Sequence, residues 1–220
     1  MKGIYFGEVH SYKDLNLLLE PFTPTPAKPQ TNLLKIPGRD GYLDLTEANG
    51  EVKFNSREFQ FAFTIAPGDT LTFDERVSKV ASALNGLRCK ITLDRDPDYY
   101  WTGRCAVDKY AQNKNIGRIV VKATVDPYKL KHKETVTVVV LDVTGSGSGS
   151  MDLVLKNGRM VAVPTIECTE DGVIFSLNGI AYTLASGENR NLDIRLGSGN
   201  NEVTVIGTGT VTITWQEGEL

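Results

Sequence analysis

Hydrophobic and polar residues alternate with a period of two through most of the chain. In "REFQFAFTI", residues 57–65, one face holds Phe59, Phe61, Phe63 and Ile65. A strand with this pattern buries one side against a core. The segments "RCKITLD", "YYWTGRCAVDKYA", "GRIVVKATVDPYK" and "TVTVVVLDV" have similar patterns. The sequence therefore predicts a mainly β protein.

The segment "TLTFDERVSKVASALNG" breaks this pattern. Its apolar residues recur at i, i+3, i+4 and i+7, as Val77, Val80, Ala81 and Leu84. Thr72 and Glu75 have the spacing of a capping box, and Gly86 supplies a C-terminal stop. We predict one helix over residues 72–85, the only long one in the chain.

From Met151 onward, turn residues recur at short intervals. "LVLKNGRMVAV" and "VIFSLNGIAYTL" each place Asn-Gly between alternating apolar residues, a strong hairpin signal. About seven or eight short strands follow Met151, a density that is typical of a β-sandwich or jelly roll.

These patterns predict two domains. Residues 1–135 form a β-sandwich or barrel-like domain with one helix and an extended arm, and residues 136–220 form a β-sandwich. The Gly/Ser-rich residues 145–150, near this boundary, have the composition of a flexible linker.

Composition and charge narrow the classes of function. The chain is 40% hydrophobic and 23% charged, with a net charge of −3. It contains no apolar run long enough to span a membrane and no signal-peptide core, so we expect folding in the cytoplasm and no membrane partner. Neither half has the dense basic face that phosphate neutralisation needs, so no sequence-specific nucleic-acid partner is predicted.

Candidate catalytic and cofactor-binding residues are scarce. The only histidines are His10 and His132, and no zinc-protease, nucleophile-elbow or phosphate-loop motif occurs. The glycine-rich segments "GTGTVTITW" and "GSGNNE" precede no helical pattern, so they do not make a phosphate site. We predict no catalytic residue, no cofactor and no enzymatic activity.

The nearest approach to a metal motif is "DRDPDYYWTGRC", with aspartates at 94, 96 and 98. A calcium-binding loop starting at Asp94 needs Gly at its sixth position and Glu at its twelfth, but Tyr99 and Cys105 stand there. No metal site is predicted, and the aspartates are assigned to a turn.

The three cysteines, Cys89, Cys105 and Cys168, are far apart, odd in number and never in a C-x-x-C pair. Each shares strand parity with apolar residues. We expect three buried free thiols, with a reactive or paired thiol as the alternative.

Two aromatic residues of the second domain, Tyr182 and Trp215, are candidates for a weak saccharide site. Aromatic rings on a β-sandwich can stack on sugars, although such residues more often belong to a core or an interface.

A proline-rich run precedes the first long strand. It holds Pro21, Pro24, Pro26 and Pro29 in "PFTPTPAKPQ". Proline cannot supply central ladder hydrogen bonds, so this run is expected to be an extended arm over a surface. Residues 38–41 (Gly-Arg-Asp-Gly) are predicted to form a tight turn with charged side chains at its tip.

Such an arm suits a protein whose surface recurs on an identical neighbour. We therefore place a hypothetical inter-subunit interface at the residues around the turn, namely Pro37, Arg39, Asp40 and Tyr42.

The order and spacing of several segments resemble the distal tail protein (Dit) family of long-tailed bacteriophages and related prophage tail-like particles. The segments are "IPGRDGYLDLT", "REFQFAFTI", the helix ending in "LNG", "LDRDPDYYWTGR", "VDPYK" and "IRLGSGNNEVTVIGTGTVTITWQEGEL". Together they extend over nearly the whole chain.

The resemblance implies a virion structural protein of the baseplate or tail tip, assembled in the cytoplasm of the bacterial host. In this family the N-terminal domains form a ring, usually a hexamer, at the end of the tail tube. The ring joins the tube to the tail-tip hub protein, and often to receptor-binding proteins. The C-terminal domain is a galectin-like sandwich, and the arm between early strands touches the neighbouring subunit. For this chain, that arm is expected within residues 21–50.

Two other functions stay open on the residues alone. The C-terminal sandwich could be a carbohydrate-binding module for a host cell-surface saccharide. A cell-wall hydrolase would need a carboxylate pair, and spacing nominates none.

Overall fold

The computed structural model describes residues 3–48, 50–65, 71–113, 116–141, 148–191 and 193–220. It is mainly β, with a single helix in this described part, as predicted. The chain divides into two compact units, Met1–Lys129 and Leu130–Leu220. The boundary expected from the sequence, between residues 135 and 136, lies a few residues further along. No helix in the described ranges is long and apolar enough to cross a membrane.

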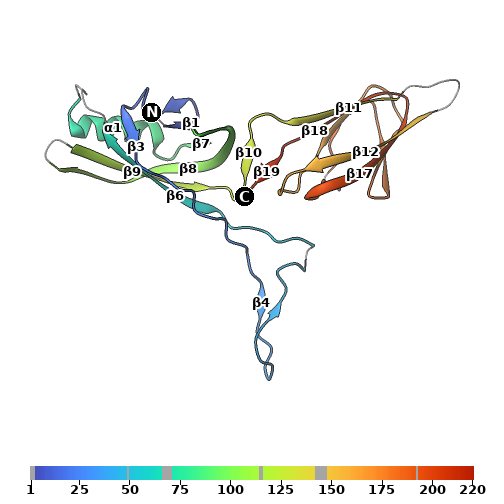
Figure 1. The fold of residues 1–220 in the computed structure, drawn as a ribbon, viewed down its shortest axis with the longest axis horizontal. Coiled ribbons are helices and arrows are strands. Elements are labelled where there is room, and N and C mark those ends of the chain that lie inside the picture. Colours follow the sequence, from blue (N-terminus) through green and yellow to red (C-terminus); the bar gives the residue numbers. More distant parts are fainter. Residues whose placement is uncertain (1–2, 49, 66–70, 114–115, 142–147, 192) are drawn as a thin grey trace. The chain divides into compact units, whose positions relative to one another are not determined.

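The first unit is built on one antiparallel sheet with the strand order β2-β1-β7-β8-β9-β6-β3 (Figure 1). These strands are β1 (Ile4–Phe6), β2 (Val9–His10), β3 (Leu17–Leu19), β6 (Arg57–Ile65), β7 (Arg88–Leu93), β8 (Asp96–Asn113) and β9 (Ile116–Val125). A separate two-stranded sheet pairs β4 (Leu33–Leu34) with β5 (Leu43–Asp44). It belongs to the segment between β3 and β6.

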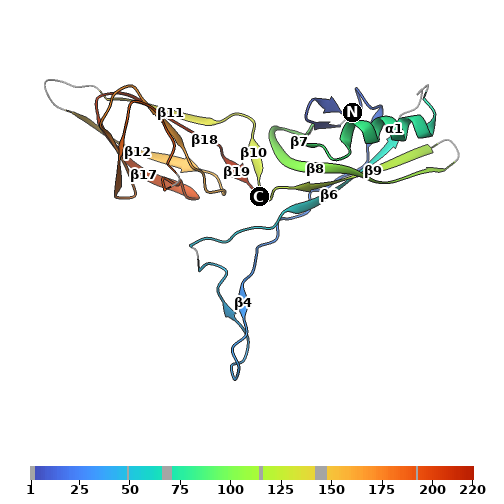
Figure 2. The same cartoon turned by 180° about the vertical axis from the view of Figure 1, so that it is seen from behind.

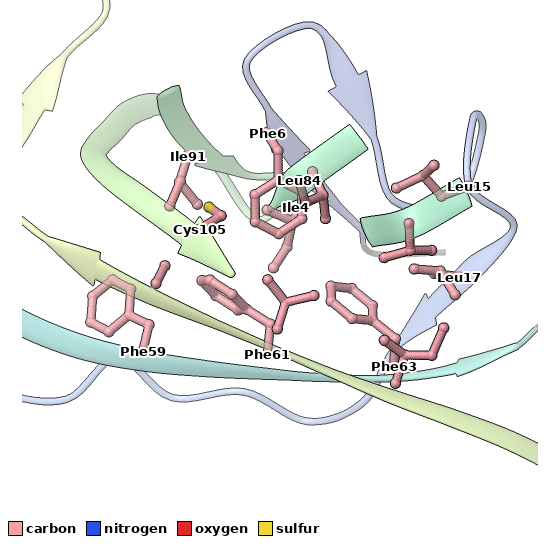
Figure 3. Close-up of a cluster of buried hydrophobic side chains, with 14 of the residues drawn as sticks. Ile4, Phe6, Leu15, Leu17, Phe59, Phe61, Phe63, Leu84, Ile91 and Cys105 are labelled. Atoms are coloured by element: carbon pink, nitrogen blue, oxygen red, sulfur yellow. The ribbon is translucent and has the colours of Figure 1, made fainter. Parts of the chain in front are cut away.

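Strand β6 confirms the predicted alternation. Phe59, Phe61 and Phe63 have no exposed surface, and they point together into the core (Figure 3). There they meet residues of other strands and of the helix, among them Phe6 and Leu84. The Phe6 ring packs edge-on against the rings of Phe61 and Phe63, an arrangement that suits the aromatic quadrupole.

Helix α1 (Phe73–Leu84) begins and ends within one residue of the prediction. The Thr72 hydroxyl accepts a hydrogen bond from the Glu75 amide, and the Glu75 carboxylate accepts one from the Thr72 amide. This capping box satisfies backbone donors that the first turn leaves free. The helix covers one face of the sheet, as both views of the ribbon show (Figure 2). Its side chains Val80 and Leu84 are fully buried.

The second unit is a β-sandwich, as predicted. One antiparallel sheet has the order β11-β18-β13-β16 and the other β12-β17-β14-β15. Their strands are β11 (Thr135–Leu141), β12 (Gly149–Asn157), β13 (Thr165–Cys168), β14 (Val173–Leu177), β15 (Ile180–Leu184), β16 (Gly187–Asn189), β17 (Gly199–Gly207) and β18 (Gly209–Trp215). The short strands β10 (Lys129–Lys131) and β19 (Gly218–Glu219) pair with each other. Side chains from both inner faces, including Phe175 and Trp215, make one core.

The two Asn-Gly signals have different outcomes. Asn178 and Gly179 join β14 to β15 with positive φ values of 49° and 85°, so this hairpin is confirmed. The hairpin predicted at Asn157-Gly158 is wrong, because β12 pairs with β17. Asn157 is buried and donates hydrogen bonds to loop carbonyls, including that of Leu196 at 3.0 Å.

The first half of the Gly/Ser-rich stretch, residues 145–147, lies outside the described residues. Its end, Gly149 and Ser150, already belongs to β12. Because both β11 and β12 lie within the second unit, this stretch connects two strands of one sandwich.

All three cysteines are free. Cys105 and Cys168 are buried, whereas Cys89 is half-buried, so the expectation of burial fails in part at Cys89. The hydrogen bond between the Cys89 and Cys105 thiols, together with burial, raises the pKa of Cys105, which keeps that thiol protonated.

Candidate assembly site on the arm

The segment between β3 and β6 forms an extended hairpin, which we call the arm and define as residues 21–56. Its two limbs are joined by backbone hydrogen bonds, from the Gln30 amide to the Lys53 carbonyl and from the Asn55 amide to the Lys28 carbonyl, at 2.8 and 2.9 Å. Among its described residues none is buried. The arm therefore has no hydrophobic core of its own.

The distal end of the arm is held by β4 and β5, which pair Leu33 with Asp44 and Leu34 with Leu43 (Figure 1). Beyond this pair lies the tip, which we define as residues 35–42.

The tip begins with a tight turn. The Arg39 amide donates to the Ile36 carbonyl at 3.2 Å, with Pro37 and Gly38 between them. Gly38 has a φ of 79°, so it supplies the positive φ that a type II turn requires at its third position, and Pro37 precedes it as is common in such turns. The turn predicted over residues 38–41 is thus centred slightly earlier in the chain.

The structure brings the four predicted interface residues together at the tip. Pro37, Arg39 and Asp40 are exposed, and Tyr42 keeps 60% of its surface exposed. The two leucines of β4, Leu33 and Leu34, are each 50% exposed. The distal arm thus presents apolar and charged side chains side by side.

The base of the arm is fixed to the sheet by a buried cation. Arg57 is only 6% exposed, and its guanidinium lies over the rings of Phe59 and Trp101. It donates to the carbonyls of Thr25 and Pro127. Burial lowers the pKa of Arg57, but an arginine remains charged at neutral pH. Arg57 therefore links the first limb of the arm to the end of β9.

Two further arginines hold the segment that enters the arm. Arg95 donates to the Phe22 carbonyl at 2.9 Å, and the Phe22 ring packs on Phe61 at 4.5 Å between centroids. Arg118 makes a forked ion pair with Glu20, at 2.7 and 2.8 Å. That hydrogen bond lowers the pKa of the Glu20 carboxyl.

Sequence reasoning missed these base residues. A signal was present at one of them, because Arg57 has the same strand parity as Phe59, Phe61 and Phe63 and so lies on the buried face. A charge at a buried position implies a partner. The partners of Arg95 and Arg118 lie 73 and 98 residues away, and no local pattern identifies them.

The two saccharide candidates lie on the inner side of the sandwich. Trp215 is 3% exposed and belongs to the core, so its ring has no free face for a sugar. Tyr182 is half-buried against the same core, and its hydroxyl donates to the Asp193 carbonyl at 3.3 Å. Their contacts are those of core residues.

The ring of the buried His10 is held by neighbouring groups of the fold. The His10 Nδ1 atom accepts hydrogen bonds from the amides of Tyr12 and Lys13, both at 3.1 Å. Nε2 therefore carries the proton and faces the Asp94 carboxylate at 3.3 Å. Both ring nitrogens are engaged within the fold. Within the described ranges, no group of three or more His, Cys, Asp or Glu residues could hold a metal ion.

Comparison with known proteins places the chain in a family. The model of the phage tail protein RIFT-related domain family matches residues 6–126, more than half of the chain, and the chain belongs to that family. The structure is similar to that of the Dit protein of phage SPP1, with a TM-score of 0.71 and 15% sequence identity, over 100% of both chains. A chain of the activated phage P2 baseplate is 8% identical, with a TM-score of 0.39, over 99% of this chain and 98% of that one. No curated protein matches the chain.

The expected membership of a phage tail family is confirmed by the family model, and the expected resemblance to distal tail proteins is confirmed in fold. The protein is a bacteriophage tail protein with a structural role in the virion tail. Its family and its structural neighbours are tail components and not enzymes.

Proposed function

We propose that this tail protein is the distal tail protein of a phage or prophage and forms a ring, a hexamer, at the tail tip. The ring joins the end of the tail tube to the tail-tip hub protein and to receptor-binding proteins. Its first unit and arm make the contacts between copies, and it assembles in the cytoplasm of the bacterial host. Its role is that of an adaptor and an open conduit for DNA.

The arm is the observation that carries this proposal. A two-stranded hairpin without a core is marginally stable in water, and yet this one presents exposed leucines and a tyrosine. Exposed apolar groups of this kind are typical of a surface that a partner covers. Because Arg57 and Arg95 fix its base, the arm is preorganised and loses less entropy when it binds.

The fold supports the choice of partner. The SPP1 Dit protein, which has the same fold, is described as part of a hub adsorption apparatus. We extend that placement to this chain.

Native mass spectrometry of the purified chain across a concentration range tests the proposal, together with negative-stain imaging. We expect a closed species of six chains of 24.1 kDa each, with a central hole. If the chain stays monomeric, both alone and when mixed with tail-tube protein, the ring is refuted.

A double variant tests the location of the interface. Arg39→Ala/Asp40→Ala should weaken the ring without unfolding the subunit, because both side chains are exposed. The matched control, Arg190→Ala/Asp193→Ala, removes the same two charges from exposed positions of the second unit. Normal assembly of the arm variant would refute our placement of the interface.

A further inference from the structure

The arm contains a pocket as well as a tip. The pocket has a volume of about 560 Å³ and is lined by residues of both limbs. Its apolar lining comes from Pro29, Val52 and Phe54. The Phe54 ring also packs edge-on against Tyr128, at 5.9 Å between centroids, so this side of the pocket is fixed to the body of the unit.

The remaining lining is polar and acidic, with Asp44 and Glu47 beside two threonines. Asp44 accepts a hydrogen bond from the Thr46 amide at 2.9 Å, and the Thr46 hydroxyl and amide lower the pKa of Asp44. Asp44 is therefore anionic at neutral pH. The nearby cation Lys53 is already bound to Glu51. The pocket thus combines an apolar wall with uncompensated negative charge.

The tip of the same arm has the complementary chemistry. Lys35 and Arg39 are exposed, and in the part of the chain that the structure describes their side chains make no ion pair. Tyr42 and Leu34 flank them and are 60% and 50% exposed. The only acidic residue of the tip is Asp40, which leaves the tip with a net positive charge.

We propose that this pocket receives the arm tip of a second copy of the chain. The inference rests on the proposed ring and names the contact that closes it. Lys35 and Arg39 meet the carboxylates of Asp44 and Glu47, and the apolar side chains of the tip cover the apolar wall. Charge complementarity of this kind selects the partner and fixes the register of docking.

The occupant must come from another copy because the arm keeps its own tip and pocket apart. The β4–β5 pair, Leu33 with Asp44 and Leu34 with Leu43, stands between the tip and the rest of the pocket. The tip and the pocket are different surfaces of one chain, so each copy can give its tip to one neighbour and receive the tip of another; the proposed contact is of this head-to-tail kind. Head-to-tail contacts generate closed rings when the rotation between subunits closes.

Charge reversal on each side tests the contact. The tip variant is Lys35→Glu/Arg39→Glu. The pocket variant is Thr31→Lys/Glu47→Lys, which leaves the hydrogen bonds of Asp44 in place. Each variant alone places like charges together, and its self-association should fall roughly 100-fold in native mass spectrometry. All four positions are exposed, so circular dichroism and thermal melting should match the wild type.

Mixing the two variants gives the decisive result. A negative tip then meets a positive pocket, a positive tip meets a negative pocket, and assembly returns. Because the variants must alternate, the mixed ring contains equal numbers of each. The four substitutions combined in one chain should likewise restore self-association. The control Lys133→Glu/Lys156→Glu replaces two cations with glutamates outside the arm, as the tip variant does within it, and should leave the ring intact.

The outcomes separate this inference from the ring itself. If the wild type forms rings and either reversal leaves association unchanged, the tip does not bind this pocket although the ring stands. If both reversals disrupt the ring but mixing does not restore it, the pocket is not the acceptor. If the wild type itself never associates, the proposed function fails and the pocket contact fails with it.

Discussion

The arm and the sheet body belong to the same unit, yet different interactions hold them. In the body, Phe59, Phe61 and Phe63 have no exposed surface. In the arm, none of the described residues is buried, and hydrogen bonds between the limbs replace a core. Burial of apolar surface is the dominant favourable contribution to folding, so the body provides the stability. The arm provides a contact surface, and it depends for its stability on the body to which it is anchored.

The largest expected effect is the difference in unfolding free energy between two variants, one with an apolar side chain truncated in the body and one with such a truncation in the arm. Phe61→Ala should lower the free energy of unfolding by about 3–5 kcal/mol, because it leaves a cavity in the core. Leu33→Ala, at a half-exposed position of the arm, should change it by less than about 0.5 kcal/mol. Urea unfolding followed by circular dichroism measures both. Similar losses in the two variants would show that the arm is part of the cooperative fold.

The next largest effect on stability is expected at Arg57, which joins the arm to the body. Arg57→Met removes the donor to the Thr25 and Pro127 carbonyls and should cost about 1–3 kcal/mol. Hydrogen exchange should also become faster in the first limb of the arm while the core of the body stays protected. The control Arg88→Met removes an exposed guanidinium that pairs with Asp126, and it should leave both measurements unchanged. Unaltered exchange in the arm would mean that Arg57 does not position it.

Local patterns in the sequence predicted the elements whose causes are local. The strand β6 follows from its four alternating apolar residues, the helix from the Thr72–Glu75 capping box, and the β14–β15 hairpin from Asn178-Gly179. The location of the arm follows from the prolines, because they prevent its first limb from pairing in a central strand.

Features that depend on distant partners could not be predicted in this way. Asn157 looked like a turn residue, but its amide donates to carbonyls 39 and 40 residues away. The partners of Arg57 lie 32 and 70 residues away, and the pocket needs both limbs in place. Trp215 was a surface candidate by residue type, and only the packing of two sheets shows that it is buried.

A smaller effect concerns the helix that covers the body. Thr72→Ala removes the hydroxyl that accepts from the Glu75 amide and should cost about 1 kcal/mol. The control Thr72→Ser keeps a hydroxyl and should retain most of the stability. Thermal unfolding of the two variants measures the difference. Because Thr72 caps a helix of the body and lies outside the arm, self-association of the folded chain should not change. A loss of rings in Thr72→Ala would contradict the separation of body and arm.

The smallest effect is the pH dependence of the ion pair where the chain enters the arm. The hydrogen bond from Arg118 lowers the pKa of Glu20 below its ordinary value of 4.5, so the pair stabilises the fold above that value. This contribution is lost as the pH falls through the folded-state pKa, when the carboxylate takes up a proton. Since Arg118 is 53% exposed, the pair should contribute less than about 1 kcal/mol.

Unfolding free energies measured from neutral to acidic pH should therefore fall less steeply in Glu20→Gln than in the wild type. In Arg118→Gln and in the double variant, the unfolding free energy should depend on pH as weakly as in Glu20→Gln, because all three variants remove the same ion pair. A wild-type slope in Glu20→Gln would mean that the pair forms equally in the unfolded chain and does not help to fix the arm.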